Sequence, residues 1–289
     1  MKNFRRYLPY ILFIFLIIFL SLIWYVVYLK DTHSNILKVA YLDVGQGDAI
    51  YIEAPNGRQM LIDGGPGASV LSSLGQVMPF ADRSIDLVLA THTDADHIGG
   101  FPFVLDKYKV GHIIENGASS DTRTFRDLES RVNKYKIDKI IATRGTRIIL
   151  DKNLNIYFDI LFPDRDISNF ESNDGSIVGR LVYGNESFMF TGDATKYTEH
   201  LIMTNENSST LHSQVLKLGH HGSRYSSSEL WLLSVHPDVA IISAGLNNRY
   251  GHPHQEVLDL LKKLSIPYLT TYQKGTIIFK TDGVTLTHN

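Results

Sequence analysis

The sequence predicts an α/β fold in which two β-sheets pack face to face between outer helices, preceded by one transmembrane helix. Three observations support this fold: an uncharged N-terminal segment, two blocks that each begin with short strands and continue into helices, and the absence of a second linker. We therefore divide the chain into an N-terminal anchor at residues 1–30, a linker at residues 31–36 and one globular domain at residues 37–289.

The anchor is predicted from residues 8–29, a run of 22 residues without a charged side chain. About 20 residues of helix cross the hydrocarbon core of a bilayer, so this run is long enough to span a membrane. Lys2, Arg5 and Arg6 precede it, and this positive flank predicts a cytoplasmic N-terminus with the rest of the chain outside. A cleaved signal peptide is the alternative, but the run is longer than a typical signal core and no small-residue cleavage motif follows it.

The first block of the domain begins with β-rich segments separated by glycine turns, at residues 36–45, 48–57 and 58–65. From residue 70 helical stretches alternate with buried strands, including a strand at residues 85–90 and an amphipathic helix at residues 123–135.

The second block repeats this order. Its β-rich segments are residues 146–163 and 176–193. The segments that follow are a helix near residues 195–203, a strand at 213–219, a helix near 227–235, a strand at 238–245, a helix at 254–264 and two closing strands. Two such halves are typical of two packed sheets with helices outside.

The composition limits the kinds of site that this domain can build. A net charge of −2 provides no strong basic field of the kind that accompanies non-specific nucleic-acid binding, although a local basic groove stays open. Cysteine is absent, which excludes disulfides, thiolate ligands and a cysteine nucleophile. The 12 histidines and the carboxylates are therefore the strong metal ligands available.

The strongest motif follows the strand at residues 85–90, where His92, Asp94, Asp96 and His97 lie on a turn before two glycines. Four potential ligands within six residues can wrap around one or two cations, because the backbone changes direction at each step of a turn. A polar helix-start loop capped by aspartate is the alternative. The interleaved carboxylates favour the metal site.

Two isolated aspartates also follow predicted strands. Asp63 precedes two glycines, as in a common tight turn, but it could instead hold a ligand histidine by a hydrogen bond and fix its tautomer. Asp193 lies between Gly192 and Ala194, where it could cap a helix or supply the oxygens that bridge two cations.

The last two motifs contain histidines. His220 and His221 are bounded by glycines, and because adjacent side chains diverge in extended chain, we expect one of them to bind metal and the other to contact substrate or the residues that surround the ligands. In the segment NNRYGHPH, His252 is a candidate general acid or substrate contact and His254 is a surface or capping residue.

Taken together, these motifs resemble those of the metallo-β-lactamase superfamily. The segments LDVGQGDAIYIEAPNGRQMLIDGG, HTDADHIGG, NDGSIVGRL, LKLGHHGS and NRYGHPH resemble, more narrowly, the C-terminal hydrolase domain of ComEC competence proteins, over nearly all of residues 38–283. The resemblance implies a four-layer αββα sandwich with a metal centre at one sheet edge, and phosphodiester hydrolysis as the leading chemistry. ComEC proteins also carry a channel of many membrane helices, so transport is not carried over to this chain.

The resemblance also implies a set of ligands. It makes His92 and Asp94 ligands of a first metal, and Asp96 with His97 ligands of a second. Asp193 would bridge the two, and His221 or His220 would complete the second site. A histidine that is common in the superfamily is replaced by Asn173 or Asp174, which makes the first site rich in oxygen. Oxygen donors shift the preference from Zn²⁺ toward Mn²⁺ or Mg²⁺, so we expect one or two ions of Zn²⁺ or Mn²⁺ per chain.

These expectations predict a membrane-anchored, extracytoplasmic phosphodiesterase that acts on DNA and is linked to DNA uptake. Asp96 and His252 would take part in catalysis, with His252 protonating the leaving oxygen. The side chains expected to contact substrate are Lys217, Ser223, Arg224 and Arg249. A cell-wall phosphocholine or teichoic-acid phosphodiesterase is one alternative, and a catalytically weak module that presents DNA to a separate uptake channel is another.

Overall fold

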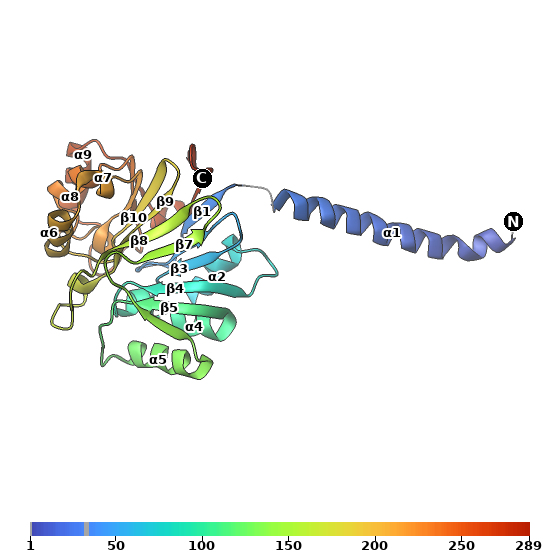
Figure 1. Ribbon diagram of the computed structural model, residues 1–289, viewed down its shortest axis with the longest axis horizontal. Helices are drawn as coiled ribbons and strands as arrows, with labels where there is room; N and C mark the ends of the chain where they lie inside the picture. Colours follow the sequence, from blue (N-terminus) through green and yellow to red (C-terminus); the bar gives the residue numbers. More distant parts are fainter. Residues whose placement is uncertain (1, 32–34) are drawn as a thin grey trace. The chain divides into compact units, whose positions relative to one another are not determined.

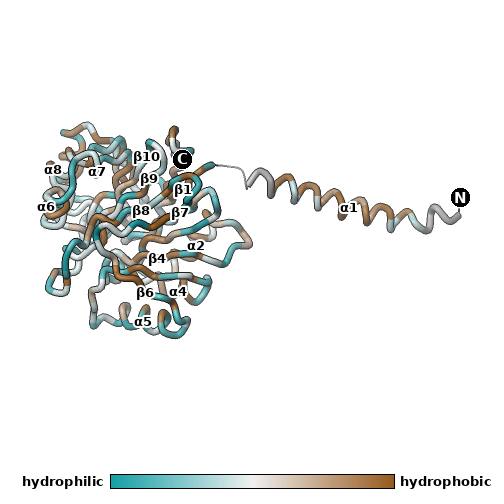
Figure 2. The backbone as a smooth tube through the Cα atoms, in the orientation of Figure 1, coloured by the Kyte–Doolittle hydropathy of each residue, from teal (hydrophilic) through white to brown (hydrophobic). Residues whose placement is uncertain are grey.

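The computed structural model describes residues 2–31 and 35–289, and it divides into two compact units, Met1–Asn35 and Ile36–Asn289. Residues 32–34 of the predicted linker lie outside the described residues. The first unit consists of helix α1 (Lys2–Asp31). Its segment Tyr7–Val27 has 21 residues with a mean hydropathy of 2.8 (Figure 2) and no buried residue, so α1 is long and apolar enough to span a membrane.

The second unit contains two β-sheets. The first sheet has the strand order β15-β14-β1-β2-β3-β4-β5-β6. Its strands are β1 (Leu37–Tyr41), β2 (Ile50–Glu53), β3 (Gln59–Ile62), β4 (Ser84–Ala90), β5 (Lys109–Glu115), β6 (Asp138–Ile141), β14 (Ile277–Thr281) and β15 (Leu286–His288). The three strands predicted at the start of the domain are β1, β2 and β3.

The second sheet has the order β13-β12-β11-β10-β9-β8-β7. Its strands are β7 (Arg147–Asp151), β8 (Ile156–Phe162), β9 (Val178–Tyr183), β10 (Glu186–Phe190), β11 (Val215–Lys217), β12 (Val239–Ile242) and β13 (Tyr268–Thr270). The hairpins β7–β8 and β9–β10 are antiparallel, and β10, β11, β12 and β13 run parallel.

Helices cover the outer face of each sheet (Figure 1). On the first sheet they are α2 (Ser69–Val77), α3 (Ala95–Ile98), α4 (Phe101–Lys107) and α5 (Arg123–Tyr135). On the second sheet they are α6 (Lys196–Asn205), α7 (Ser208–Leu211), α8 (Glu229–Val235) and α9 (Gln255–Lys263). The short elements η1 (Asn173–Gly175), η2 (Gly219–Gly222) and α10 (Thr271–Lys274) lie in connections.

Three hydrophobic cores define the layers. Strand β1 shows how they arise, because Leu37, Val39 and Tyr41 enter the core between the sheets while Ala40 joins the core under the helices of the first sheet. Phe158 and Phe190 stack in the central core with ring centroids 5.8 Å apart. A third core lies between the second sheet and its helices. The predicted four-layer αββα arrangement is confirmed.

The strand directions determine where the polar motifs meet. Strands β3 and β4 are parallel neighbours in the first sheet, and β10, β11 and β12 are parallel neighbours in the second. Each of these strands is followed by one of the motifs that the sequence singled out. Because parallel strands end at the same edge of a sheet, the motifs of each sheet converge on that edge.

Candidate metal centre

Four side chains from three of these motifs form the centre of the site. His97 Nε2 lies 3.2 Å from Asp193 Oδ1, and His221 Nε2 lies 3.5 Å from Asp193 Oδ2. Asp96 completes the group, because its Oδ2 is 3.3 Å from His221 Nε2. His97, Asp193 and His221 are almost completely buried. The structure thus brings together the predicted ligands of the second metal with the predicted bridging residue.

The tautomers of His97 and His221 indicate that a positively charged species lies between the donor atoms of this group. His97 Nδ1 donates to Asp63 Oδ2 at 2.7 Å, and His221 Nδ1 donates to the Ser243 carbonyl at 2.8 Å. In the neutral ring each Nε2 then has a lone pair that faces carboxylate oxygens. Within the described residues, these two Nε2 atoms and Asp193 Oδ1 have no hydrogen-bond partner. Facing acceptors in a buried site repel each other unless a proton or a cation lies between them.

The spacing of the donor atoms fits a metal ion. Ligands held tetrahedrally at about 2.05 Å from an ion lie ~3.3 Å from one another. The donor pairs around Asp193 and His221 are 3.2 to 3.5 Å apart. Two carboxylates and two neutral imidazoles also match the charge of one divalent cation. Nitrogen and oxygen donors of this kind accept Zn²⁺ or Mn²⁺.

Asp63 orients two histidines at once. Besides His97, it accepts hydrogen bonds from the Thr91 backbone N–H at 2.8 Å and from the Thr91 hydroxyl at 2.7 Å. Because that hydroxyl proton is given to Asp63, the Thr91 oxygen accepts from His92 Nδ1 at 3.0 Å. The Nε2 atoms of both His92 and His97 are thereby left free. This is the geometry in which a carboxylate fixes ligand tautomers from outside the ligand set.

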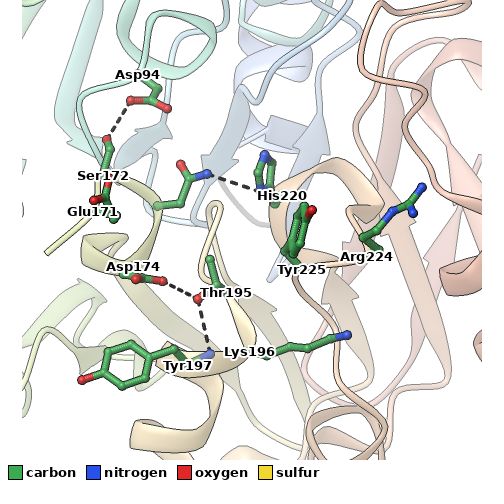
Figure 3. Close-up of a pocket in the computed structure, with 11 residues that line it drawn as sticks. Asp94, Glu171, Ser172, Asp174, Thr195, Lys196, Tyr197, His220, Arg224 and Tyr225 are labelled. Carbon is green, nitrogen blue, oxygen red and sulfur yellow. Dashed lines mark hydrogen bonds between the residues drawn. The ribbon is translucent and has the colours of Figure 1, made fainter.

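The predicted first metal site is more open. His92 Nε2 lies 3.7 Å from Asp94 Oδ2, and Asp94 Oδ1 accepts a hydrogen bond from Ser172 at 2.7 Å (Figure 3). The Asp94 side chain is 44% exposed, whereas His92 is buried. Asn173 Nδ2 contacts His220 Nδ1 at 3.4 Å and so faces this half of the site. Asp174 instead bonds the Thr195 hydroxyl, which directs it toward the start of α6 and away from His92 and Asp94.

Both residues of the histidine pair face Asp193. His220 Nε2 lies 3.7 Å from Asp193 Oδ2, and His221 Nε2 lies 3.5 Å from the same atom. The expectation that only one of them reaches the centre assumed extended backbone. In the structure both residues are left-handed, with φ of 50° and 55°, and the resulting turn brings their side chains to the same side.

The sequence analysis missed Asp48, which is buried beside this centre. Its Oδ1 lies 3.3 Å from His221 Nδ1, and its Oδ2 lies 2.6 Å from Lys217 Nζ. Asp48, His97, Asp193 and His221 have one potential donor atom each within 4.8 Å of one another. Asp48 nevertheless approaches His221 from its Nδ1 side, and Lys217 neutralises it. We therefore assign Asp48 to the surroundings of the ligands and Asp96 to the ligand set.

A glycine makes the position of Asp48 possible. Gly47 has a φ of +128°, and a Cβ there would lie 2.1 Å from the Asp96 carbonyl oxygen. The loop thus approaches α3 as closely as backbone allows, and the Asp48 N–H donates to that carbonyl at 3.2 Å. A carboxylate in a glycine-bounded turn was the signal that could have identified Asp48.

The pKa shifts follow from this concentration of charge. Burial lowers the pKa of His97 and His221, but Asp193 with Asp63 raises that of His97 well above its usual range, and Asp193 with Asp48 raises that of His221 to about 9. Burial raises the pKa of Asp96, yet His221 and His97 overcome this and lower it to about 2. The carboxylates are ionised, and the group attracts positive charge.

Two substrate-contact predictions are corrected by burial. Lys217 is fully buried, and its ammonium group contacts Asp48 and donates to the Leu218 carbonyl at 2.8 Å, so it does not reach substrate. Ser223 is 1% exposed, and its hydroxyl accepts from the Tyr225 N–H at 3.4 Å within the turn. Both residues therefore stabilise the segment around the histidine pair, at residues 217–225, and are not accessible to substrate.

Two further histidines, His252 and His254, come from the segment NNRYGHPH. His252 lies beside the histidine pair, with its ring centroid 5.2 Å from that of His220. Burial, followed by the charges of His221 and His220, lowers the pKa of His252 to about 4, which leaves the ring neutral near pH 7. His254 immediately precedes α9 but makes no side-chain hydrogen bond to cap it, and its Nδ1 instead accepts from the Arg224 N–H at 3.2 Å.

Comparison with known proteins identifies the class. The family model described as the metallo-beta-lactamase superfamily matches residues 42–246, and the chain belongs to this superfamily. A solved structure of Igni18, a metallo hydrolase from the archaeon Ignicoccus hospitalis, covers 84% of this chain and 98% of its own with a TM-score of 0.54 at 15% identity. That similarity confirms the fold.

Similarity to curated proteins identifies a narrower family within this superfamily. The chain is 35% identical over 262 residues to ComE operon protein 3 of Bacillus subtilis, covering 84% of this chain and 33% of the relative. It is 30% identical over 251 residues to competence protein ComA of Neisseria gonorrhoeae, covering 85% and 32%. These are ComEC-type competence proteins, and the predicted resemblance is confirmed. The chain spans about a third of the length of these relatives.

Proposed function

We propose that this chain is a membrane-anchored, extracytoplasmic, metal-dependent phosphodiesterase that acts on DNA and is connected with DNA uptake. The observation that carries the proposal is the group of Asp96 with the buried His97, Asp193 and His221, whose donor atoms face one another at metal-ligand spacing. The similarity to competence proteins supports DNA as substrate and a DNA-uptake channel protein as a partner.

Different residues of the site would bind the cation and the substrate. A bound divalent cation would supply Lewis acidity for a phosphoryl oxygen and for a water nucleophile. Asp96 and Asp193 would hold it with the two histidines, and Asp193 Oδ2 also faces His220 Nε2. Because its ring is neutral, we assign His252 to a hydrogen bond with substrate in preference to general-acid catalysis.

The full chain in detergent provides the test. With added Mn²⁺ it should hydrolyse bis-p-nitrophenyl phosphate and linear DNA, and Asp96→Ala and Asp193→Ala should remove both activities. Asp121→Ala, at an exposed position outside the centre, is the matched control and should retain them. Failure to hydrolyse any phosphodiester with any divalent cation would refute the hydrolase.

One observation favours the cell-wall alternative. The net charge of −2 gives little general attraction to a polyanion such as DNA, whereas binding of a phosphocholine group, which also carries a positive charge, does not depend on such attraction. If the model ester is cleaved while single-stranded and double-stranded DNA stay intact, this alternative replaces the nuclease. If DNA is bound but nothing is cleaved, the chain is the accessory DNA-binding module.

A further inference from the structure

Two cavities open beside the metal centre, and they share no lining residue. The first has a volume of about 580 Å³ and includes Asp94 and His220 in its wall. The second has a volume of about 410 Å³ and includes Asp96. Each cavity therefore takes part of its wall from a different part of the centre. A substrate larger than one phosphodiester can occupy both cavities while its phosphate lies at the donors.

The first cavity carries cations and aromatic rings. Lys196, Tyr197, Arg224 and Tyr225 line it, together with the carboxylates of Asp94, Glu171 and Asp174 (Figure 3). Tyr225 is 67% exposed, and its carbonyl accepts from the Lys196 N–H at 2.9 Å, which ties the two segments together. The cavity thus offers an accessible ring on a fixed backbone beside two positive groups.

The second cavity repeats this chemistry. Arg249 lies over the Tyr250 ring at 4.8 Å from its centroid and donates to the Tyr250 hydroxyl at 2.5 Å. Tyr250 in turn stacks on His252, with centroids 5.7 Å apart and an interplanar angle of 20°. The Asn248 side chain holds this loop by bonds to both the N–H and the carbonyl of His252. The planar side chains of Arg249, Tyr250 and His252 therefore form a row that reaches the histidine pair.

We propose that a single strand of nucleic acid lies across the centre with nucleotides on both sides of the cleaved phosphate, and is cut internally. This rests on the proposed phosphodiesterase function. A base would stack on Tyr225 in the first cavity and on Tyr250 in the second, with neighbouring phosphates at Lys196 and Arg224 and at Arg249. Aromatic platforms beside cations are the usual way to bind unpaired bases and their backbone.

The aromatic platforms separate single strands from duplex. Paired bases hide their faces in the duplex stack, so the tyrosine platforms favour single strands over duplex. Because the strand leaves through both cavities, a free end is not required.

Circular single-stranded DNA tests the internal cut. With Mn²⁺ the full chain should convert the circle to linear strands and then to fragments. An intact circle beside degradation of a linear strand of the same sequence would overturn the proposal. If neither these DNAs nor bis-p-nitrophenyl phosphate is cleaved, the phosphodiesterase function has failed, and the strand-binding site is then decided by binding alone.

Binding of a labelled oligothymidine, followed by fluorescence anisotropy in the presence of EDTA, does not depend on turnover. Tyr225→Ala and Tyr250→Ala should each weaken it about tenfold, the effect expected for one lost base stack. Tyr268→Ala changes an exposed tyrosine outside both cavities and should have no effect. Equal affinities for the wild type and both cavity variants, or tighter binding of duplex than of single strands, would refute the site.

Discussion

Lys217 Nζ lies 2.6 Å from Asp48 Oδ2, and both side chains are completely buried directly behind His221. Asp48 also approaches His221 Nδ1 at 3.3 Å. The ammonium group thus balances a carboxylate that would otherwise add a further negative charge to the centre. Lys217 ends strand β11, and through Asp48 it helps to orient the His221 ring.

Removal of one partner of the Lys217–Asp48 pair should destabilise the folded protein. Lys217→Met leaves the Asp48 carboxylate buried without its counter-ion, and we expect a loss of about 3–5 kcal/mol in the free energy of unfolding, measured by urea denaturation. Combining it with Asp48→Asn should recover most of the loss. The exposed pair Lys263–Glu229 is the control, because Lys263→Met should cost less than about 1 kcal/mol. Equal losses in the two lysine variants would contradict this account.

Asp63 should control metal affinity without binding metal. Asp63→Asn keeps the shape and tolerates the left-handed φ of 56°, but it removes an acceptor that Thr91 and His97 share. Loss of such an outer hydrogen bond lowers affinity about 10–100-fold, which calorimetric titration with Mn²⁺ would detect. Asp121→Asn is the exposed control. An Asp63→Asn affinity equal to the wild-type value would disprove the orienting role.

The raised pKa of His221 predicts a pH dependence of metal binding. A cation on Nε2 displaces the proton that this group holds up to a pKa of about 9, so Mn²⁺ affinity should rise about tenfold per pH unit for each displaced proton from neutral pH toward that value. Titrations in buffers of different ionisation enthalpy would count the released protons. Affinity that is constant from pH 6 to about 9 would contradict the proposed donor set.

The stability of EDTA-treated protein should show the opposite trend. The folded pKa of His221 lies above the unfolded value of about 6.5, so its contribution is complete below pH ~6.5 and is lost as pH rises through about 9. Thermal melting with EDTA should therefore shift to lower temperature over this range. The exposed His112, replaced in His112→Gln, should not change the trend. An upward shift of the melting temperature with pH would reverse the assigned sign.

The helix α1 should hold the chain in the membrane. Deletion of residues 7–27 should move the protein from the membrane fraction to the soluble fraction of cell lysates, because this segment supplies the apolar surface. A reporter fused after Asn289 that needs an extracytoplasmic location should be active on the intact chain. Activity only of a cytoplasmic reporter would overturn the proposed orientation.

Periodicity predicted the regular elements and failed at short, exposed ones. The amphipathic pattern at residues 123–135 coincides with α5 (Arg123–Tyr135). Strand β6 was missed because it is four residues long and wholly exposed, without the alternation of buried and exposed positions that identifies a strand in a sequence. Two closing strands were predicted after the helix at residues 254–264, where the structure has three, β13, β14 and β15.

The site was predicted through its motifs, and the errors come from burial and backbone turns. The sequence shows that Lys217 is charged but not that it is buried against Asp48. It shows that His220 and His221 are adjacent but not that left-handed backbone turns both toward Asp193. Asp48 was missed because its role depends on a close approach of two loops that are distant in the sequence.

The central claim is that Asp96, His97, Asp193 and His221 hold a divalent cation. Native mass spectrometry of the full chain in detergent, after exchange into Mn²⁺ or Zn²⁺, measures the bound ions directly. The wild type should carry at least one ion per chain, and Asp193→Ala should carry none. A wild-type chain without a bound ion, or an Asp193→Ala chain that keeps the full number, would contradict the claim.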